Sequence, residues 1–182
     1  MEVDSDHGND LVSAKSTTCV LTWISGPRTH VPLSQSVKST PSTGRSTAEV
    51  ESVAIDRGTF VHAIPAAATL EFILGRPVRI VGRSDNTAAI SAAKAGFSRK
   101  LAYAKKHQRI SLSALREVYV GKEEHEEGSP SINSLTHIST IKNRSDMGTK
   151  PLDHARHWTL MSLARMFRLQ EIRKMTATNN KL

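Results

Sequence analysis

Strand-like and helix-like patterns alternate along this chain in an order that few folds accommodate. An apolar, β-branched run at 19–24 is typical of a strand and ends at the turn 25–27, and residues 30–33 fit its hairpin partner. Further strands are expected at 78–82 and 136–141, with helical patterns between and after them. Two strands in hairpin order, followed by strands that alternate with helices, predict an α/β fold in which helices cover a mixed sheet.

Capping and breaking residues place the expected helices. Ser46 and Glu49 fit a capping box at the start of one helix, and Pro65 predicts that this helix kinks or stops before a second piece that runs to Leu74. The other helices are expected at 86–96, 99–118 and 154–175, and the polar stretches at 34–47 and 121–131 are expected to be loops.

Charge and composition narrow the class of protein. The 182 residues contain 25 Lys and Arg against 17 Asp and Glu, and the formal net charge of +8 points to a polyanionic partner. The single cysteine, Cys19, excludes an internal disulfide, and no apolar run approaches the ~18 residues of a membrane helix. The acidic, polar N-terminal segment does not fit a signal peptide. We therefore expect an intracellular protein that is neither secreted nor membrane-bound.

Four carboxylates stand at the edges of the expected elements. Asp4 follows the first few residues, Glu51 lies in the first turns of the capped helix, Asp85 follows the strand at 78–82, and Asp146 begins the last helical region. Each one alone is more commonly a helix cap or a solvated group. Together they can supply the hard oxygen ligands that divalent cations such as Mg²⁺ need from several elements at once.

Local motifs give these carboxylates a context. The chain contains, in this order, the segments VDSDHGND, STAEVESVAI, VRIVGRSDNTAAI and NRSDMGTKPL. Between or within them lie Lys15–Thr18, Lys106-His107, Leu115–Glu117 and Thr149–Leu152. This ordered set resembles the ribonuclease H domain that ends the polyprotein of copia-type LTR retrotransposons, which contains K-S-T-S, D-N-x-x-A-I and T-K-P-L at the corresponding places. The resemblance covers residues 3 to about 167.

The resemblance implies a ribonuclease H-like fold, which is a mixed five-stranded sheet flanked by helices. We expect this domain over residues 1–152, followed by a C-terminal helix and tail over 153–182. Only residues 1–3 precede Asp4, so the first strand is expected to be truncated.

The resemblance also assigns the site. For the first motif Asp4 is preferred to Asp6, which stays open as the alternative ligand, and Glu51 is preferred to Glu49, which already has a capping role. The expected catalytic residues, which would also hold the metal, are Asp4, Glu51, Asp85 and Asp146.

The implied reaction is Mg²⁺-dependent endonucleolytic cleavage of the RNA strand of an RNA·DNA hybrid, with two Mg²⁺ ions that Mn²⁺ can replace. The implied partners are the hybrid and a reverse transcriptase domain upstream in the polyprotein. Contacts to 2′-hydroxyls across the minor groove would select RNA. The expected phosphate contacts are Arg99, Lys100, Lys105, Lys106 and Arg109.

Departures from the family pattern support an alternative function. His7, Gln35 and Ser52 stand where the family has aromatic residues. In this alternative the chain is a degenerate retrotransposon remnant that does not catalyse and at most binds nucleic acid electrostatically. Two smaller possibilities are a zinc site on the histidines of 153–157, disfavoured because no third soft ligand lies nearby, and a role for His125 in product release.

Overall fold

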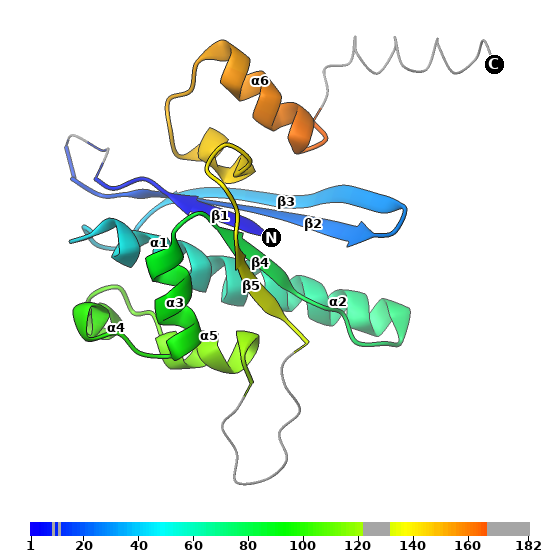
Figure 1. Cartoon of the computed structure of the whole chain (residues 1–182), viewed down its shortest axis with the longest axis horizontal. Coiled ribbons are helices and arrows are strands. Elements are labelled where there is room, and N and C mark those ends of the chain that lie inside the picture. The colour runs from blue at the N-terminus through cyan, green and yellow to red at the C-terminus, as the bar shows by residue number, and fades with distance from the viewer. Residues whose placement is uncertain (9, 11, 122–131, 167–182) are drawn as a thin grey trace, which may run out of the picture.

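In the computed structural model, which describes residues 1–8, 10, 12–121 and 132–166, five strands form one mixed sheet (Figure 1). They lie in the order β3-β2-β1-β4-β5, in which β1 is antiparallel to β2 and parallel to β4. The predicted α/β fold with a mixed five-stranded sheet is confirmed, and it is consistent with a ribonuclease H-like arrangement. The strands are β1 (Glu2–Ser5), β2 (Thr17–Gly26), β3 (Thr29–Ser39), β4 (Val81–Ser84) and β5 (Ser134–His137).

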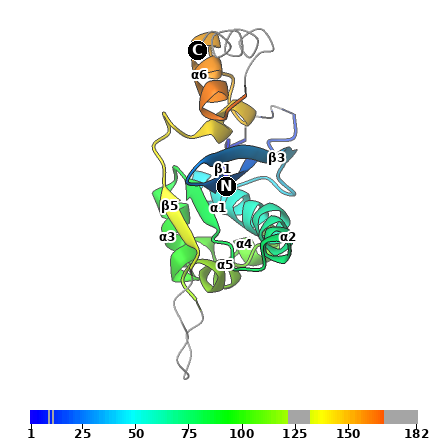
Figure 2. The same ribbon diagram turned by 90° about the vertical axis from the view of Figure 1, so that its right-hand side faces the viewer.

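Helices cover both faces of this sheet (Figure 2). On one face α1 packs against β1, β2 and β4, and α3 packs on α1 and α5; on the other, η3 packs against β1 and β2 and carries α6. None of the helices in the described part of the chain has the length and hydropathy needed to cross a bilayer. The helical segments are α1 (Thr47–Arg57), the π-helix η1 (Gly58–Ala63), α2 (Ile64–Leu74), α3 (Thr87–Ala95), the 3₁₀ helix η2 (Arg99–Leu101), α4 (Ala104–His107), α5 (Leu112–Tyr119), the 3₁₀ helix η3 (Arg144–Gly148) and α6 (His154–Leu163).

The central strand β1 is short, as expected, and completely buried. Its four residues pair with β2 along their whole length, and Glu2 also pairs with Arg83 of β4. Val3 packs in the main core with Val20 and Ile55, so a strand of small size still connects the two halves of the sheet. Asp4 therefore projects from the middle of the sheet rather than from a loose end.

An ion pair fixes η3 to the sheet. Arg144 donates from Nε to the buried carboxylate of Glu2 at 2.8 Å, and its guanidinium lies 3.9 Å from the centroid of the Trp23 ring. A buried carboxylate without such a partner would be strongly destabilising. Gly148, at the other end of η3, lies directly over Cys19 of β2, where there is no room for a side chain.

The first α-helix ends before Pro65 and the expected second piece to Leu74 is present as α2, but the π-helix η1 joins the two without a gap. Proline has no amide hydrogen to donate, which normally interrupts the α-helical ladder. Here the preceding turns adopt the wider π-helical pattern, in which the Ile64 amide bonds to the carbonyl of Thr59. Pro65 then occupies the first turn of α2, where its missing donor does no harm.

Three strand boundaries also differ from expectation. The stretch at 34–47 was predicted as a loop, yet β3 runs to Ser39, because an exposed edge strand tolerates polar side chains when its backbone pairs with β2. The strand expected at 78–82 begins only at Val81, since the amides of the residues before it bond to the side chains of Glu71 and Asn133. The strand expected at 136–141 is β5, which begins and ends earlier.

The helix expected at 99–118 is divided into η2, α4 and α5. Arg109 has a φ of 59°, a left-handed conformation that an α-helix cannot contain, and Ser111 then caps α5. The helix expected at 154–175 begins as predicted, but α6 ends at Leu163 and is followed by Arg165 with a φ of 61°. Residues beyond 166 lie outside the described part of the chain.

The close packing of η3 against β2 can be tested with Gly148→Ala. The new Cβ would lie 2.5 Å from Cys19 Sγ and 2.9 Å from its Cβ, so the substitution should lower the free energy of unfolding by about 1–3 kcal/mol in urea titrations. Gly26→Ala is the matched control, because its Cβ would make only ordinary contact at 3.8 Å. Equal stability of the two variants would contradict the close packing of η3.

Candidate metal centre

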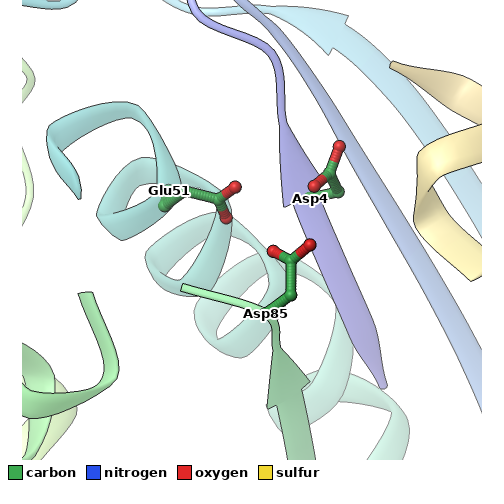
Figure 3. Close-up of side chains that lie close together, drawn as sticks. All are labelled: Asp4, Glu51 and Asp85. Carbon is green, nitrogen blue, oxygen red and sulfur yellow. The ribbon is translucent and has the colours of Figure 1, made fainter. Parts of the chain in front are cut away.

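Three of the four predicted carboxylates meet at one end of the sheet (Figure 3). Asp4 lies in β1, Glu51 lies in α1, and Asp85 is the residue that directly follows β4. One carboxylate oxygen of each lies within 4.8 Å of one oxygen of each of the other two. Asp4 and Asp85 meet because β1 and β4 are parallel neighbours, whose C-terminal ends share one edge of the sheet.

Glu49 has a structural role at the start of α1, although its carboxylate reaches back to the Arg45 amide, one residue before the N-cap amide that a capping box uses. Ser46 caps α1 by accepting a hydrogen bond from the Glu49 amide. The Glu49 carboxylate accepts hydrogen bonds from the Arg45 amide, the Tyr103 hydroxyl and the Gln108 side-chain amide, at 2.7 to 2.9 Å. Because these donors occupy both of its oxygens, Glu49 stabilises the start of α1 and is not part of the acidic cluster.

Glu51, two residues later, faces the sheet and is oriented by it. Its Oε1 accepts a hydrogen bond from the Ser5 amide, and its Oε2 accepts one from the Ser84 hydroxyl, each at 3.4 Å. Asp85 is oriented by the Thr140 hydroxyl, which donates to its Oδ2 at 2.8 Å. Strand ends and one loop thus hold both carboxylates in place from outside the cluster.

Asp4, not Asp6, belongs to the acidic cluster. The Asp6 carboxylate accepts a hydrogen bond from the Thr17 amide and so holds the start of β2. Asp4 accepts hydrogen bonds from the Thr149 hydroxyl and from the Lys150 ammonium, the latter at 3.3 Å. Neither Thr149 nor Lys150 is among the predicted site residues, although both lie in the T-K-P-L motif, which is the available signal in the sequence.

Asp146 lies outside the cluster of three and is joined to it by a lysine. Lys150 Nζ is 2.7 Å from one Asp146 oxygen and 3.3 Å from one Asp4 oxygen. The second Asp146 oxygen lies 3.4 Å from the Arg156 guanidinium. The expectation that Asp146 is itself a metal ligand stays a prediction.

Asp4 and Glu51 are buried beside the half-buried Asp85, and the three negative charges repel one another. Burial raises the pKa of Asp4 to about 6, against the lowering effects of the Thr149 hydrogen bond and the Lys150 charge. Burial and the charges of Asp4 and Asp85 raise the pKa of Glu51 well above its ordinary value. A cation between the three carboxylates would relieve both effects.

These residues fit a divalent cation of the Mg²⁺ class. The donors are hard carboxylate oxygens from several elements, and a cleft of about 350 Å³ lined by Glu51, Asp85 and Lys150 lies beside them. Elsewhere in the described residues no other group of three His, Cys, Asp or Glu side chains converges, so the zinc site at 153–157 has no support. His125 lies outside the described residues.

The predicted nucleic-acid contacts lie on η2, α4 and the turn after it, and all five are exposed. This segment is tied to the start of α1, because Tyr103 and Gln108 both donate to Glu49. The basic surface and Glu51 are therefore fixed to the same helix. The five residues are Arg99, Lys100, Lys105, Lys106 and Arg109.

Comparison with protein-family models, with curated proteins and with solved structures found no match to this chain. The ribonuclease H resemblance stays an interpretation of the sequence motifs.

The raised pKa of Asp4 predicts a pH-dependent stability in the absence of metal. The folded protein holds a proton on Asp4 up to about pH 6, whereas the unfolded chain loses it near 3.8, so Asp4 destabilises the fold as the pH rises through this window. Asp4→Asn does not titrate. Its stability relative to the wild type should increase by roughly 2–3 kcal/mol from below to above this window, in urea titrations with EDTA. A constant difference at all pH values would contradict the assigned shift.

Proposed function

We propose that this chain is a Mg²⁺-dependent endonuclease that cleaves the RNA strand of RNA·DNA hybrids, as the intracellular ribonuclease H domain of a copia-type retrotransposon polyprotein. The observation that carries the proposal is the convergence of Asp4, Glu51 and Asp85 at the edge shared by β1 and β4. The order of the motifs in the sequence supports the choice of family. The upstream reverse transcriptase domain is part of the same proposal.

The chain's own groups prepare the site for this reaction. Asp4, Glu51 and Asp85 would hold the ion, which supplies the Lewis acidity for in-line displacement at phosphorus. The amide of Ser5 and the hydroxyl of Thr140 fix the directions of two of these carboxylates before substrate arrives. Such preorganisation means that the ligands need not rearrange during the reaction.

The basic segment on η2 and α4 would position the hybrid. Its exposed Lys and Arg side chains contact phosphates without reading sequence, which suits an enzyme that acts on any hybrid. Because Gln108 and Tyr103 connect this segment to Glu49, the phosphate contacts keep a fixed distance from Glu51. RNA would be distinguished by its 2′-hydroxyls in the minor groove.

Asp85→Asn tests whether cleavage depends on a divalent cation that Asp85 binds. The amide keeps the shape of the side chain but loses the charge that binds a divalent cation. Cleavage of a labelled hybrid with Mg²⁺ or Mn²⁺ should fall at least about a hundredfold, because even groups that only orient metal ligands cost about 10–100-fold when removed. Hybrid binding should stay nearly unchanged.

Glu117→Gln is the control, because it removes an exposed carboxylate on α5 outside the cluster. It should cleave like the wild type. Equal cleavage by wild type and Asp85→Asn would refute the assigned ligand. Folded wild-type protein that binds hybrid but does not cleave it would favour the degenerate remnant instead.

The basic surface is tested by the double variant Lys105→Ala/Lys106→Ala. Each phosphate contact releases counterions, so losing two contacts should weaken hybrid binding and reduce the slope of log K against log salt by about two. Arg28→Ala is the matched control, because Arg28 is exposed at the β2–β3 turn, at the opposite end of the sheet. The same slope for the double variant and the wild type would remove these lysines from the interface.

A further inference from the structure

Lys150 has an unusual position for a lysine. Its ammonium lies between Asp4 and Asp146, at 3.3 and 2.7 Å, and both carboxylate side chains are almost completely buried, with 1% and 3% exposure. About a third of the lysine side chain is exposed, and Lys150 lines the cleft beside the acidic cluster. Lys150 is therefore a cation held between the cluster and the fourth predicted carboxylate.

We propose that the Lys150 ammonium occupies the position of the second cation, so that the centre binds one divalent ion, at Asp4, Glu51 and Asp85. This inference depends on the proposed function and sharpens it. A two-ion site needs a second ion about 3.5–4 Å from the first, held by a carboxylate that the two ions share. In this chain Asp4 is the carboxylate that two ions would share. Besides the other two carboxylates of the cluster, Asp4 contacts the Lys150 ammonium.

The charges of the site agree with a single ion. Four carboxylates face two cationic side chains, Lys150 and Arg156, which leaves a formal excess of two negative charges. One divalent cation balances this excess. A second divalent ion could bind between Asp4 and Asp146 only if it displaced Lys150. The Lys150 ammonium is the cationic partner of both buried carboxylates.

The backbone fixes Lys150 in this place. The amides of Thr149 and Lys150 both bond to the carbonyl of Asp146, so the lysine lies one turn after the aspartate that it contacts. Gly148, in the same turn, packs directly against Cys19, where there is no room for a side chain. The ammonium is thus part of the folded scaffold and not the end of a free surface side chain.

The test counts bound Mn²⁺ ions, independently of activity. Free Mn²⁺ is measured by electron paramagnetic resonance while the full chain is titrated with MnCl₂. The wild type should bind one ion, whereas Lys150→Gln, which frees Asp4 and Asp146, should bind two, with the spectral broadening of a coupled pair. Lys94→Gln removes an exposed lysine on α3 and should still bind one.

Two further variants keep the test valid if Lys150→Gln does not fold. Lys150→Arg retains the cation and should bind one ion. Asp146→Asn should bind one ion with a Kd within about threefold of the wild type, because Asp146 contacts Lys150 and not the cluster.

The outcomes separate this inference from the proposed function. Two ions on the wild type, one ion on folded Lys150→Gln, or a tenfold weaker Kd for Asp146→Asn would overturn the role of Lys150 and leave a metal-dependent nuclease intact. No Mn²⁺ bound by folded wild type would overturn both.

Discussion

The mutual repulsion of Asp4, Glu51 and Asp85 is the constraint on which the rest of the site depends. Burial, together with the charges of neighbouring carboxylates, raises the pKa values of Asp4 and Glu51, so the fold must hold the cluster together by other interactions. The short β1 strand is held by pairing with β2 and by the core around Val3, and α1 is held by its cap. Stability elsewhere in the molecule thus maintains an arrangement that is locally unfavourable, which is typical of sites prepared for a ligand.

In two pairs of acidic residues, Glu49 with Glu51 and Asp6 with Asp4, one residue stabilises the fold and the other lies in the acidic cluster. Glu49 is saturated by hydrogen-bond donors, whereas Glu51 has only two long contacts and faces other carboxylates. Asp6 holds a strand end, and Asp4 enters the cluster. In each pair one residue stabilises the scaffold, and the other lies in the cluster, where its carboxylate faces two other carboxylates.

The sequence predicted what local rules determine. Caps such as Ser46 and Asn86 mark helix starts because they act within three residues, and the ordered motifs identified the carboxylates that the sheet brings together. It missed what depends on distant contacts. The polar strand β3 depends on its pairing with β2, and the contact of Lys150 with Asp4 depends on the docking of η3 against the sheet. The π-helical turn before Pro65 is a local adjustment of the backbone that no residue pattern indicated.

The contact between Gly148 and Cys19 makes the only thiol of the chain a reporter of local opening. Cys19 is completely buried, and burial together with the Asp4 charge raises its pKa to about 12, so in the closed state it is both shielded and protonated. Because Gly148 lies directly over the sulfur, a thiol reagent would reach it when η3 lifts away from β2. Since η3 carries Asp146, the alkylation rate would measure how often η3 separates from the sheet, in openings that cost less free energy than unfolding of the whole molecule.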